Sequence, residues 1–273
     1  MRQFGLILAV IVLATGCRQE KAVQQQQQLY DATAAAKKEV AREKAPVLYE
    51  MPAPLKDRPE QILKRKGYTT SYNSKTRNPN WVAWHLTKSH TYGSEQRSGM
   101  LFTEDTSVAA PRATDQDYYN SRYDRGHMCP AGDNKWSCEA MTESFLFTNI
   151  CPQNHGLNKY EWNDLEILCR DWARTYGAID IVCGPLYPPT GQEKTIGRNK
   201  VWVPSAFFKV VLCRQEQPKA IGFIYQNLGQ KQKIEDAVRS VDEIERLTGI
   251  DFFPALDDKT ENRIEAAARL ADW

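Results

Sequence analysis

Apolar positions in the body of the chain follow two spacings, and each spacing predicts a different kind of element. Short runs rich in aromatic and β-branched residues predict strands, at residues 81–87, 178–184, 207–213 and 220–226. Apolar side chains at helical spacing predict helices, over residues 158–176, 234–249 and 261–271. Residues 144–150 fit either a strand or the end of a helix. Because strands and helices alternate without a regular βαβ order, the pattern favours an α+β fold over a doubly wound sheet.

The first 17 residues have the layout of an export signal, with a basic residue, an apolar run from Phe4 to Leu13 and small residues before Cys17. The run is too short to cross a bilayer as a helix, which takes about 20 residues. The ending LATGC resembles a bacterial lipobox, although Ala14 replaces a larger aliphatic residue. We therefore predict an exported protein, anchored to a bacterial membrane by lipid on Cys17 and facing the periplasm or the cell surface. A plain signal peptide, with Cys17 incidental, is the alternative.

A polar segment separates this signal from the body of the chain. It contains five consecutive glutamines, Gln24–Gln28, and then a stretch rich in alanine and lysine that has little apolar surface to bury. Prolines punctuate its end. The chain is therefore predicted to have three parts: a lipoprotein signal peptide at 1–17, a polar tether at 18–59 and a globular domain at 60–273.

Composition and cysteine content add two constraints. The chain has 273 residues, 41% of them hydrophobic, and its net charge of +2 does not by itself indicate a polyanionic partner. Of seven cysteines, six remain if Cys17 carries lipid, and an even number in an exported protein is compatible with disulfides. Free buried thiols fit the sequence nearly as well. A zinc site is not expected, because no Cys-x-x-Cys spacing occurs.

Candidate chemistry begins in the segment DRGHMCPAGDN at residues 124–134. Gly126 and Pro130 interrupt regular structure, so this segment is expected at a strand end or in a loop. Such a loop holds acidic, basic and imidazole side chains close together, and loops of this kind often carry function. The imidazole of His127, with an ordinary pKa near ~6.5, can accept a proton at neutral pH. A lone histidine is more often structural, so its neighbours decide its role.

A second group of residues follows at a regular spacing. Asn158, Trp162, Glu166 and Arg170 lie four residues apart, and each such step drifts by about 40° around a helix. Asn158 and Glu166 are therefore expected on nearly one face, two turns apart. Taken alone, this set also fits a helix N-cap, a core tryptophan and a surface Glu–Arg pair.

Four sequence blocks in order, DRGH, TNIxPQ, LN and WxxLExxxR, resemble the DNA/RNA non-specific endonucleases, the ββα-metal or His-Me finger nucleases that include endonuclease G. The resemblance covers about residues 65–255 and includes LTGIDFFP at 247–254. It implies an antiparallel sheet core flanked by helices, with residues 60–273 as the nuclease domain. It also implies hydrolysis of DNA and RNA with Mg²⁺, Mn²⁺ or another divalent cation as cofactor, leaving 5′-phosphate and 3′-hydroxyl ends.

The resemblance assigns roles to individual residues. His127 would be the general base that deprotonates the attacking water. Asn158 would be the direct protein ligand of the cation, and Glu166 would hold water molecules around that ion. Asn149 would orient either His127 or the local backbone. Arg170 would contact the phosphate or neighbouring groups.

Three further residues are assigned to the substrate. Arg97 is the best candidate for an upstream arginine that braces the scissile phosphate. Arg125, like Arg170, would contact phosphate or neighbouring groups, and Asp124 would lie at the substrate beside it. Because members of this family often dimerise, the resemblance also implies a possible homodimer.

Two other functions stay open on the sequence alone. A catalytically silent, nucleic-acid-binding surface lipoprotein would bind DNA or RNA in a salt-sensitive way without cleaving it. A hydrolase with a cysteine nucleophile would instead pair Cys129 or Cys151 with His127.

Overall fold

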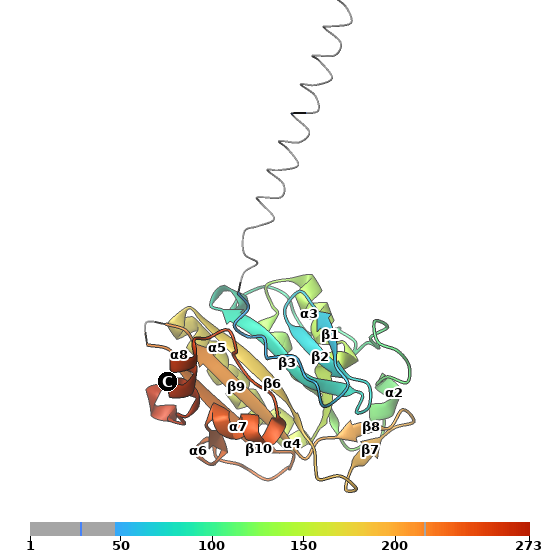
Figure 1. Ribbon diagram of the computed structural model, residues 1–273. Coiled ribbons are helices and arrows are strands. Elements are labelled where there is room, and N and C mark those ends of the chain that lie inside the picture. The colour runs from blue at the N-terminus through green and yellow to red at the C-terminus, as the bar shows by residue number, and fades with distance from the viewer. Residues whose placement is uncertain (1–27, 29–46, 216) are drawn as a thin grey trace, which may run out of the picture. The chain divides into compact units, whose positions relative to one another are not determined.

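The computed structural model describes residue 28, residues 47–215 and residues 217–273 (Figure 1). Leu48–Trp273 form one compact unit and Met1–Val47 another, of which only Gln28 and Val47 are described. The predicted signal peptide, with Cys17, and most of the predicted tether lie outside the described residues. In the part that the structure describes, no helix is both long enough and apolar enough to cross a membrane.

A seven-stranded antiparallel sheet is the centre of the described fold, in the order β1-β2-β3-β6-β9-β10-β11 (Figure 1). In chain order its strands are Gln61–Lys64, Thr69–Asn73, Asn78–Thr87, Ala178–Leu186, Ala206–Cys213, Lys219–Gln226 and Val238–Arg239. All four strands predicted from apolar runs are confirmed. The last two of them, β9 and β10, form an antiparallel pair as expected, with Phe208 opposite Ile224.

Alternation along the strands divides the core into two clusters, one on each face of the sheet. On β3, Trp84 belongs to one cluster and Trp81 to the other. The first cluster includes side chains of helix α5 (Glu161–Tyr176), and the second includes side chains of helices α7 (Val241–Thr248) and α8 (Asp258–Glu265). Burying each large apolar side chain contributes about 1.5–3 kcal/mol, so helices on both faces stabilise the sheet.

A second antiparallel pair carries the DRGH segment. Strand β4 (Asp124–His127) consists of DRGH, and it pairs with β5 (Ile150–Gln153). The short helix α4 (His155–Lys159) and then α5 follow β5 along the chain. This ββα unit brings the two candidate motifs side by side.

Several short elements complete the described fold. The helices are α2 Asp115–Tyr118, α3 Cys138–Ser144 and α6 Ile234–Ala237, the strands are β7 Lys194–Ile196 and β8 Val201–Val203, and the 3-10 turns are Ser89–Thr91, Ala131–Asp133, Phe147–Asn149 and Leu270–Asp272. Residues 144–150, which the sequence left between strand and helix end, contain the end of α3, a 3-10 turn and the first residue of β5.

The helix predicted over 158–176 is divided in two, which corrects the prediction. It consists of α4 and α5, separated at Tyr160, whose backbone (φ −114°, ψ −89°) is not helical. Asn154 rather than Asn158 caps α4, because its side chain accepts a hydrogen bond from the backbone of the first turn. Gly177, with φ 86°, ends α5 as predicted.

The other two predicted helices are also shorter than expected. Residues 234–249 form α6, β11 and α7, because residues 238–239 pair with β10 and the side chain of Ser240 caps α7. Gly249 ends α7 in the left-handed region, as its position suggested. Helix α8 begins and ends earlier than the predicted last helix.

Residues 48–59, predicted as part of the tether, lie against the body of the fold. Tyr49 and Met51 pack against the core cluster on the α7 and α8 side of the sheet. The backbone amide of Ala53 donates a hydrogen bond to the carbonyl of Asp251 (2.9 Å). This segment therefore contributes to the packing of the compact unit.

The six cysteines of the compact unit are free thiols, so no disulfide forms among the described residues. Five of them are buried, and Cys138 is exposed. Of the two alternatives that the sequence allowed, buried free thiols are the one found.

Candidate active site

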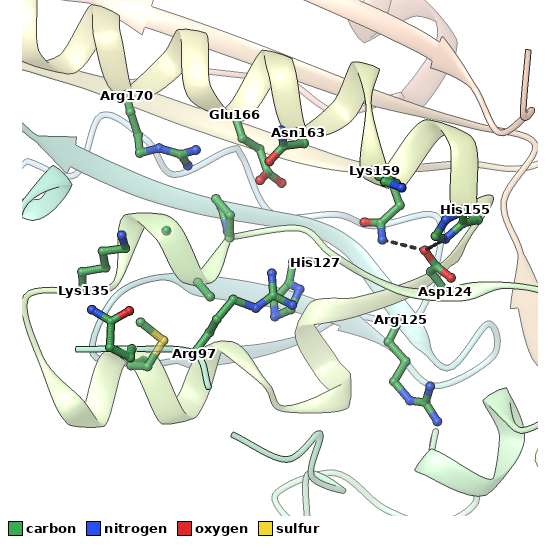
Figure 2. Close-up of a pocket in the computed structure, with 16 residues that line it drawn as sticks. Arg97, Asp124, Arg125, His127, Lys135, His155, Lys159, Asn163, Glu166 and Arg170 are labelled. Atoms are coloured by element: carbon green, nitrogen blue, oxygen red, sulfur yellow. Dashed lines mark hydrogen bonds and ion pairs between the residues drawn. The ribbon is translucent and has the colours of Figure 1, made fainter. Parts of the chain in front are cut away.

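A cavity of about 570 Å³ opens beside the ββα unit, lined by residues of β4, of the turn after it and of helices α4 and α5 (Figure 2). It collects predicted site residues from segments far apart in the chain: Arg97, Asp124, Arg125, His127, Asn158, Glu166 and Arg170. Asn149 does not line the cavity. Seven of the eight candidates in the globular unit therefore share one site.

The backbone of His127 is fixed from two sides. His127 is the last residue of β4 and lies opposite Ile150 of β5. Its carbonyl accepts a hydrogen bond from Nε1 of the buried Trp162 (3.2 Å). The ring packs edge-on against Phe145, with centroids 4.9 Å apart, and is tilted against Phe102 at 5.4 Å. The imidazole therefore has little freedom to move.

The imidazole of His127 is neutral at physiological pH. The residue is 8% exposed, and burial, with the nearby positive charge of Arg97, lowers its pKa to about 3. Its Nε2 has no hydrogen-bond partner among the described residues. A neutral imidazole can accept a proton, which is the first requirement of a general base.

Asn149 holds the backbone that follows His127. Its side-chain oxygen accepts from the amide of Cys129 (2.9 Å), and its Nδ2 donates to the carbonyls of Cys129 and Ser144 (2.8 Å each). Its own carbonyl accepts from the amide of Met128 (2.9 Å). Of the two roles that the resemblance allowed, the structure therefore places Asn149 on the local backbone.

Asp124 orients the predicted cation ligand. Its Oδ2 accepts hydrogen bonds from Nδ2 of Asn158 and from Nδ1 of His155, both at 2.9 Å, and Figure 2 shows Asp124 beside His155. With its amide nitrogen bound in this way, Asn158 keeps its side-chain oxygen available, because no donor in the described part of the chain bonds that atom. Asp124, predicted at the substrate, lines the cavity, and its carboxylate is bonded there to the amide of Asn158.

Arg170 is held in place by a buried carboxylate. Its Nη1 donates to Oδ1 of Asp133 (2.9 Å), and Nε1 of Trp84 donates to Oδ2 of the same residue (3.0 Å). Asp133 is 3% exposed. This ion pair fixes a positive charge at the cavity wall, in agreement with the predicted position of Arg170.

The other two arginines differ in their freedom to meet a substrate. Arg125 is bound to Asp115 (2.6 Å) and packs over the rings of Phe102 and Tyr118, and in Figure 2 its guanidinium points away from His127. It forms part of the rim. Arg97 lines the same cavity, and its charge acts on both His127 and Glu166. Arg97 is thus the better placed of the two to bind a phosphate beside the imidazole.

Glu166 lies on α5, one helical turn before Arg170. Burial raises the pKa of Glu166 to about 7, and the carboxylate of Asp133 raises it as well. The positive charges of Lys209 and Arg170 act in the opposite direction. The carboxyl group is therefore close to half ionised near neutral pH.

Some residues at the site were not assigned by sequence reasoning. The cavity is also lined by Lys135, His155, Lys159 and Asn163. His155 and Lys135 belong to none of the motifs that the sequence defines, and the linear sequence does not show which side chains lie next to them. The sequence does indicate that Lys209 is unusual, because it lies within the apolar run FFKVVLC. A lysine is almost never fully buried without a partner.

Comparison with known proteins places this arrangement among nucleases. Residues 47–259 match the family described as DNA/RNA non-specific endonuclease. The chain is 37% identical over 245 residues to the mitochondrial nuclease EXOG of Xenopus laevis, covering 84% of this chain and 68% of that protein. It is 35% identical to the human protein of the same name, covering 72% of this chain and 58% of that protein. Bovine mitochondrial endonuclease G is 34% identical, with 71% and 69% covered.

A solved structure shows the same architecture. The crystal structure of the EndoG/EndoGI complex, whose title concerns the mechanism of EndoG inhibition, contains a chain that superposes with a TM-score of 0.71 at 28% identity. The match covers 78% of this chain and 91% of that chain. The predicted α+β fold, an antiparallel sheet with a ββα unit and flanking helices, is confirmed.

Proposed function

Because the chain belongs to the DNA/RNA non-specific endonuclease family, we propose that it hydrolyses phosphodiester bonds in DNA and RNA with little sequence preference. One observation carries this proposal: His127, Asn158 and Glu166 line a single cavity together with Arg97 and Arg170. Hydrolysis of a charged diester requires a neutral base, a cation site and fixed positive charges. Contacts with phosphate groups carry no sequence information, which favours a broad substrate range.

In the proposed reaction, His127 takes a proton from the water that attacks phosphorus. The hydrogen bond from Trp162 and the pairing of β4 with β5 hold the histidine backbone, so little reorganisation is needed. Arg97 would bind the phosphate in line with the attacking water. Cleavage of the bond between phosphorus and O3′ leaves a 5′-phosphate on one product, and the leaving O3′ takes a proton from solvent water to become the 3′-hydroxyl of the other.

A hydrated divalent cation fits the residues of α4 and α5. Asn158 offers a neutral oxygen, and Mg²⁺ keeps several of its waters when few protein groups bind it. Asn158 would hold the ion through Oδ1, with Asp124 fixing the amide, and ionised Glu166 would accept hydrogen bonds from the surrounding waters. When bound, Mg²⁺ or a related ion such as Mn²⁺ would place positive charge beside the phosphoryl oxygens and the leaving oxygen.

The buried thiols argue against a cysteine nucleophile. Cys129 and Cys151 are both fully buried, and burial raises the pKa of each thiol well above its usual value. The thiolate is the reactive form of cysteine, and these sites disfavour it. Neither Cys129 nor Cys151 is therefore an activated nucleophile that His127 could deprotonate.

We also propose that the protein is exported and anchored by lipid on Cys17, and that it forms a homodimer. The apolar run before LATGC supports the anchor, and the family resemblance supports the dimer. Membrane fractionation with a labelled fatty acid tests the anchor: label and membrane association should both disappear in Cys17→Ser. Analytical ultracentrifugation of the purified protein tests the dimer, and a monomer mass at micromolar concentration would exclude a stable one.

The nuclease proposal is tested on the full-length protein, purified in mild detergent, with supercoiled plasmid and with RNA. Cleavage should need Mg²⁺, stop with EDTA and be lost in His127→Ala. His90→Ala is the matched control, because His90 is half-buried outside the cavity, and it should retain wild-type cleavage. Intact plasmid and RNA across several divalent ions would reject the catalytic proposal. Salt-sensitive binding without cleavage would then favour the silent binding protein.

A further inference from the structure

Lys209 is a buried cation on the sheet face that carries α5. It lies on β9, is fully buried, and its Nζ has no hydrogen-bond acceptor among the residues that the structure describes. Two residues away along the strand on either side, Phe207 and Val211 belong to the core cluster on the α5 face. Strand alternation therefore places the ammonium where an apolar side chain is expected. Since an uncompensated buried charge is strongly destabilising, neighbouring groups must balance it.

Two tryptophan rings pack on this ammonium, and buried groups nearby influence its charge. Nζ lies 4.5 Å from the ring centroid of Trp162 and 5.5 Å from that of Trp84, within the range of cation–π attraction. Burial lowers the pKa of Lys209, but the neighbouring groups of Cys183 and Cys169, followed by the carboxylates of Glu166 and Asp133, raise it, and the net direction is upward. The lysine therefore stays positively charged.

Each tryptophan connects this charge to a different part of the active site. Nε1 of Trp162 donates to the carbonyl of His127 (3.2 Å). Nε1 of Trp84 donates to Asp133 (3.0 Å), and Asp133 in turn binds Arg170 (2.9 Å). The ring of Trp162 thus holds the backbone of His127. The ring of Trp84 holds Asp133, the carboxylate that binds Arg170.

We propose that Lys209 is a positioning residue of the active site. Its ammonium packs against Trp84 and Trp162, and through them it holds His127 and the Asp133–Arg170 pair, while its charge balances Glu166 and Asp133. This inference rests on the proposed nuclease function. Lys209 does not contact substrate, and a hydrophobic core alone would not select a lysine at this place.

The charge of Lys209 should appear in the pH dependence of Glu166. The charged groups that act on Glu166 are Lys209, Arg170 and Arg97, which favour its anion, and Asp133, which opposes it. Removing the lysine charge leaves the carboxyl less often ionised at neutral pH. A rise of one pKa unit from about 7 would lower the ionised fraction at pH 7 about fivefold.

The experiment compares Lys209→Met, which removes the charge but keeps an apolar chain of similar length, with Lys209→Arg, which keeps the charge. The control is Lys219→Met on the neighbouring strand β10. Lys219 also packs over two aromatic rings, Tyr176 at 4.1 Å and Trp273 at 4.7 Å, but it does not line the cavity. Thermal unfolding verifies that each variant folds, and Lys209→Gln replaces Lys209→Met if the latter does not.

The decisive measurement is the titration of the Glu166 carboxyl carbon by ¹³C NMR in the metal-free, full-length protein. The midpoint should rise by at least about one pH unit in Lys209→Met, a scale set by removing one nearby charge. It should stay near the wild-type value in Lys209→Arg and Lys219→Met. In cleavage assays with Mg²⁺, the acid limb of the pH–kcat profile should lie about one pH unit higher in Lys209→Met than in the wild type, with little change in KM, and the loss of kcat should narrow toward pH 9.

The outcomes separate this proposal from the nuclease proposal. An active wild type with an unchanged Glu166 midpoint and a superimposable pH–kcat profile in Lys209→Met would overturn the role of Lys209 alone. A similar shift in Lys219→Met would also overturn it, because the effect would not be specific to the site. An inactive wild type would reject the nuclease function, and the carboxyl titration would still decide whether Lys209 balances Glu166.

Discussion

Replacing Asn149 with alanine is expected to release the chain segment that follows His127. The Asn149 amide makes three buried hydrogen bonds, one accepted from Cys129 and two donated to Cys129 and Ser144. A bond of this kind contributes about 1 kcal/mol net, and a buried partner left without its bond costs about 1–3 kcal/mol. Losing all three predicts a destabilisation of about 3–5 kcal/mol. That is a large part of the roughly 5–15 kcal/mol that stabilises a typical folded domain.

Urea unfolding, followed by circular dichroism, measures this loss. The midpoint should fall while the slope of free energy against urea stays the same. Asn262→Ala is the control, because its exposed side chain bonds only a carbonyl within α8, and its effect should stay below about 0.5 kcal/mol. Activity per folded molecule should fall in Asn149→Ala only, since His127 would lose its support. A loss below about 1 kcal/mol in Asn149→Ala would refute the reasoning.

Three further predictions concern charge. Burial raises the pKa of Glu265 to about 9, and like charges nearby add to the effect. Between the ordinary pKa of glutamate and pH 9, the folded state therefore holds a proton that the unfolded state releases. The free energy of unfolding falls as pH rises through this range. Glu265→Gln should therefore melt at a higher temperature than the wild type at pH 8.5 and show the smallest difference near pH 4.5; an advantage independent of pH would contradict this. His85 is cationic when protonated, and its hydrogen bond to Asp180 raises the pKa of the imidazole in the folded state. The stability that this bond provides is complete below the pKa of the unfolded state. It is lost as pH rises through the pKa of the folded state. Thermal melts should then show His85→Gln less stable than the wild type at pH 5.5 and nearly equal at pH 9. Asp124→Asn should raise the Mg²⁺ concentration needed for half-maximal binding about tenfold, measured by calorimetry, because residues that orient a ligand typically contribute that much; unchanged Mg²⁺ affinity would show that Asp124 does not orient Asn158.

The strands were the most predictable part of the fold. Runs such as FFKVVLC combine aromatic and β-branched residues over the length of a strand, and residues of these types pack well on a sheet. Helix boundaries were less predictable because they depend on packing at a distance. The break at Tyr160 lies in a sequence with continuous helical spacing. Val238 and Arg239 leave their predicted helix to pair with β10, which no local pattern reveals.

The candidate site was predictable where a motif defined both residue and spacing. His127, Asn158 and Glu166 meet in one cavity even though the helix between the last two is broken. Both side chains still line the same cavity, so the four-residue spacing predicted the right neighbours although the helix between them is not continuous. The role of Asp124 was not predictable, because it depends on how its carboxylate meets Asn158 and His155 in space.

Burial shifts the pKa values of His127 and Glu166, two titratable groups of the cavity, in opposite directions. Burial opposes the charged form of each, which lowers the pKa of His127 to about 3 and raises that of Glu166 to about 7. Between these values the base is already neutral while Glu166 is still largely protonated, so the acid limb of activity should follow the carboxyl group rather than the histidine. A divalent cation held by Asn158 would favour the anion of Glu166 and move this limb to lower pH. Desolvation in this one cavity therefore keeps His127 neutral over the whole neutral pH range, and cation binding is what ionises Glu166.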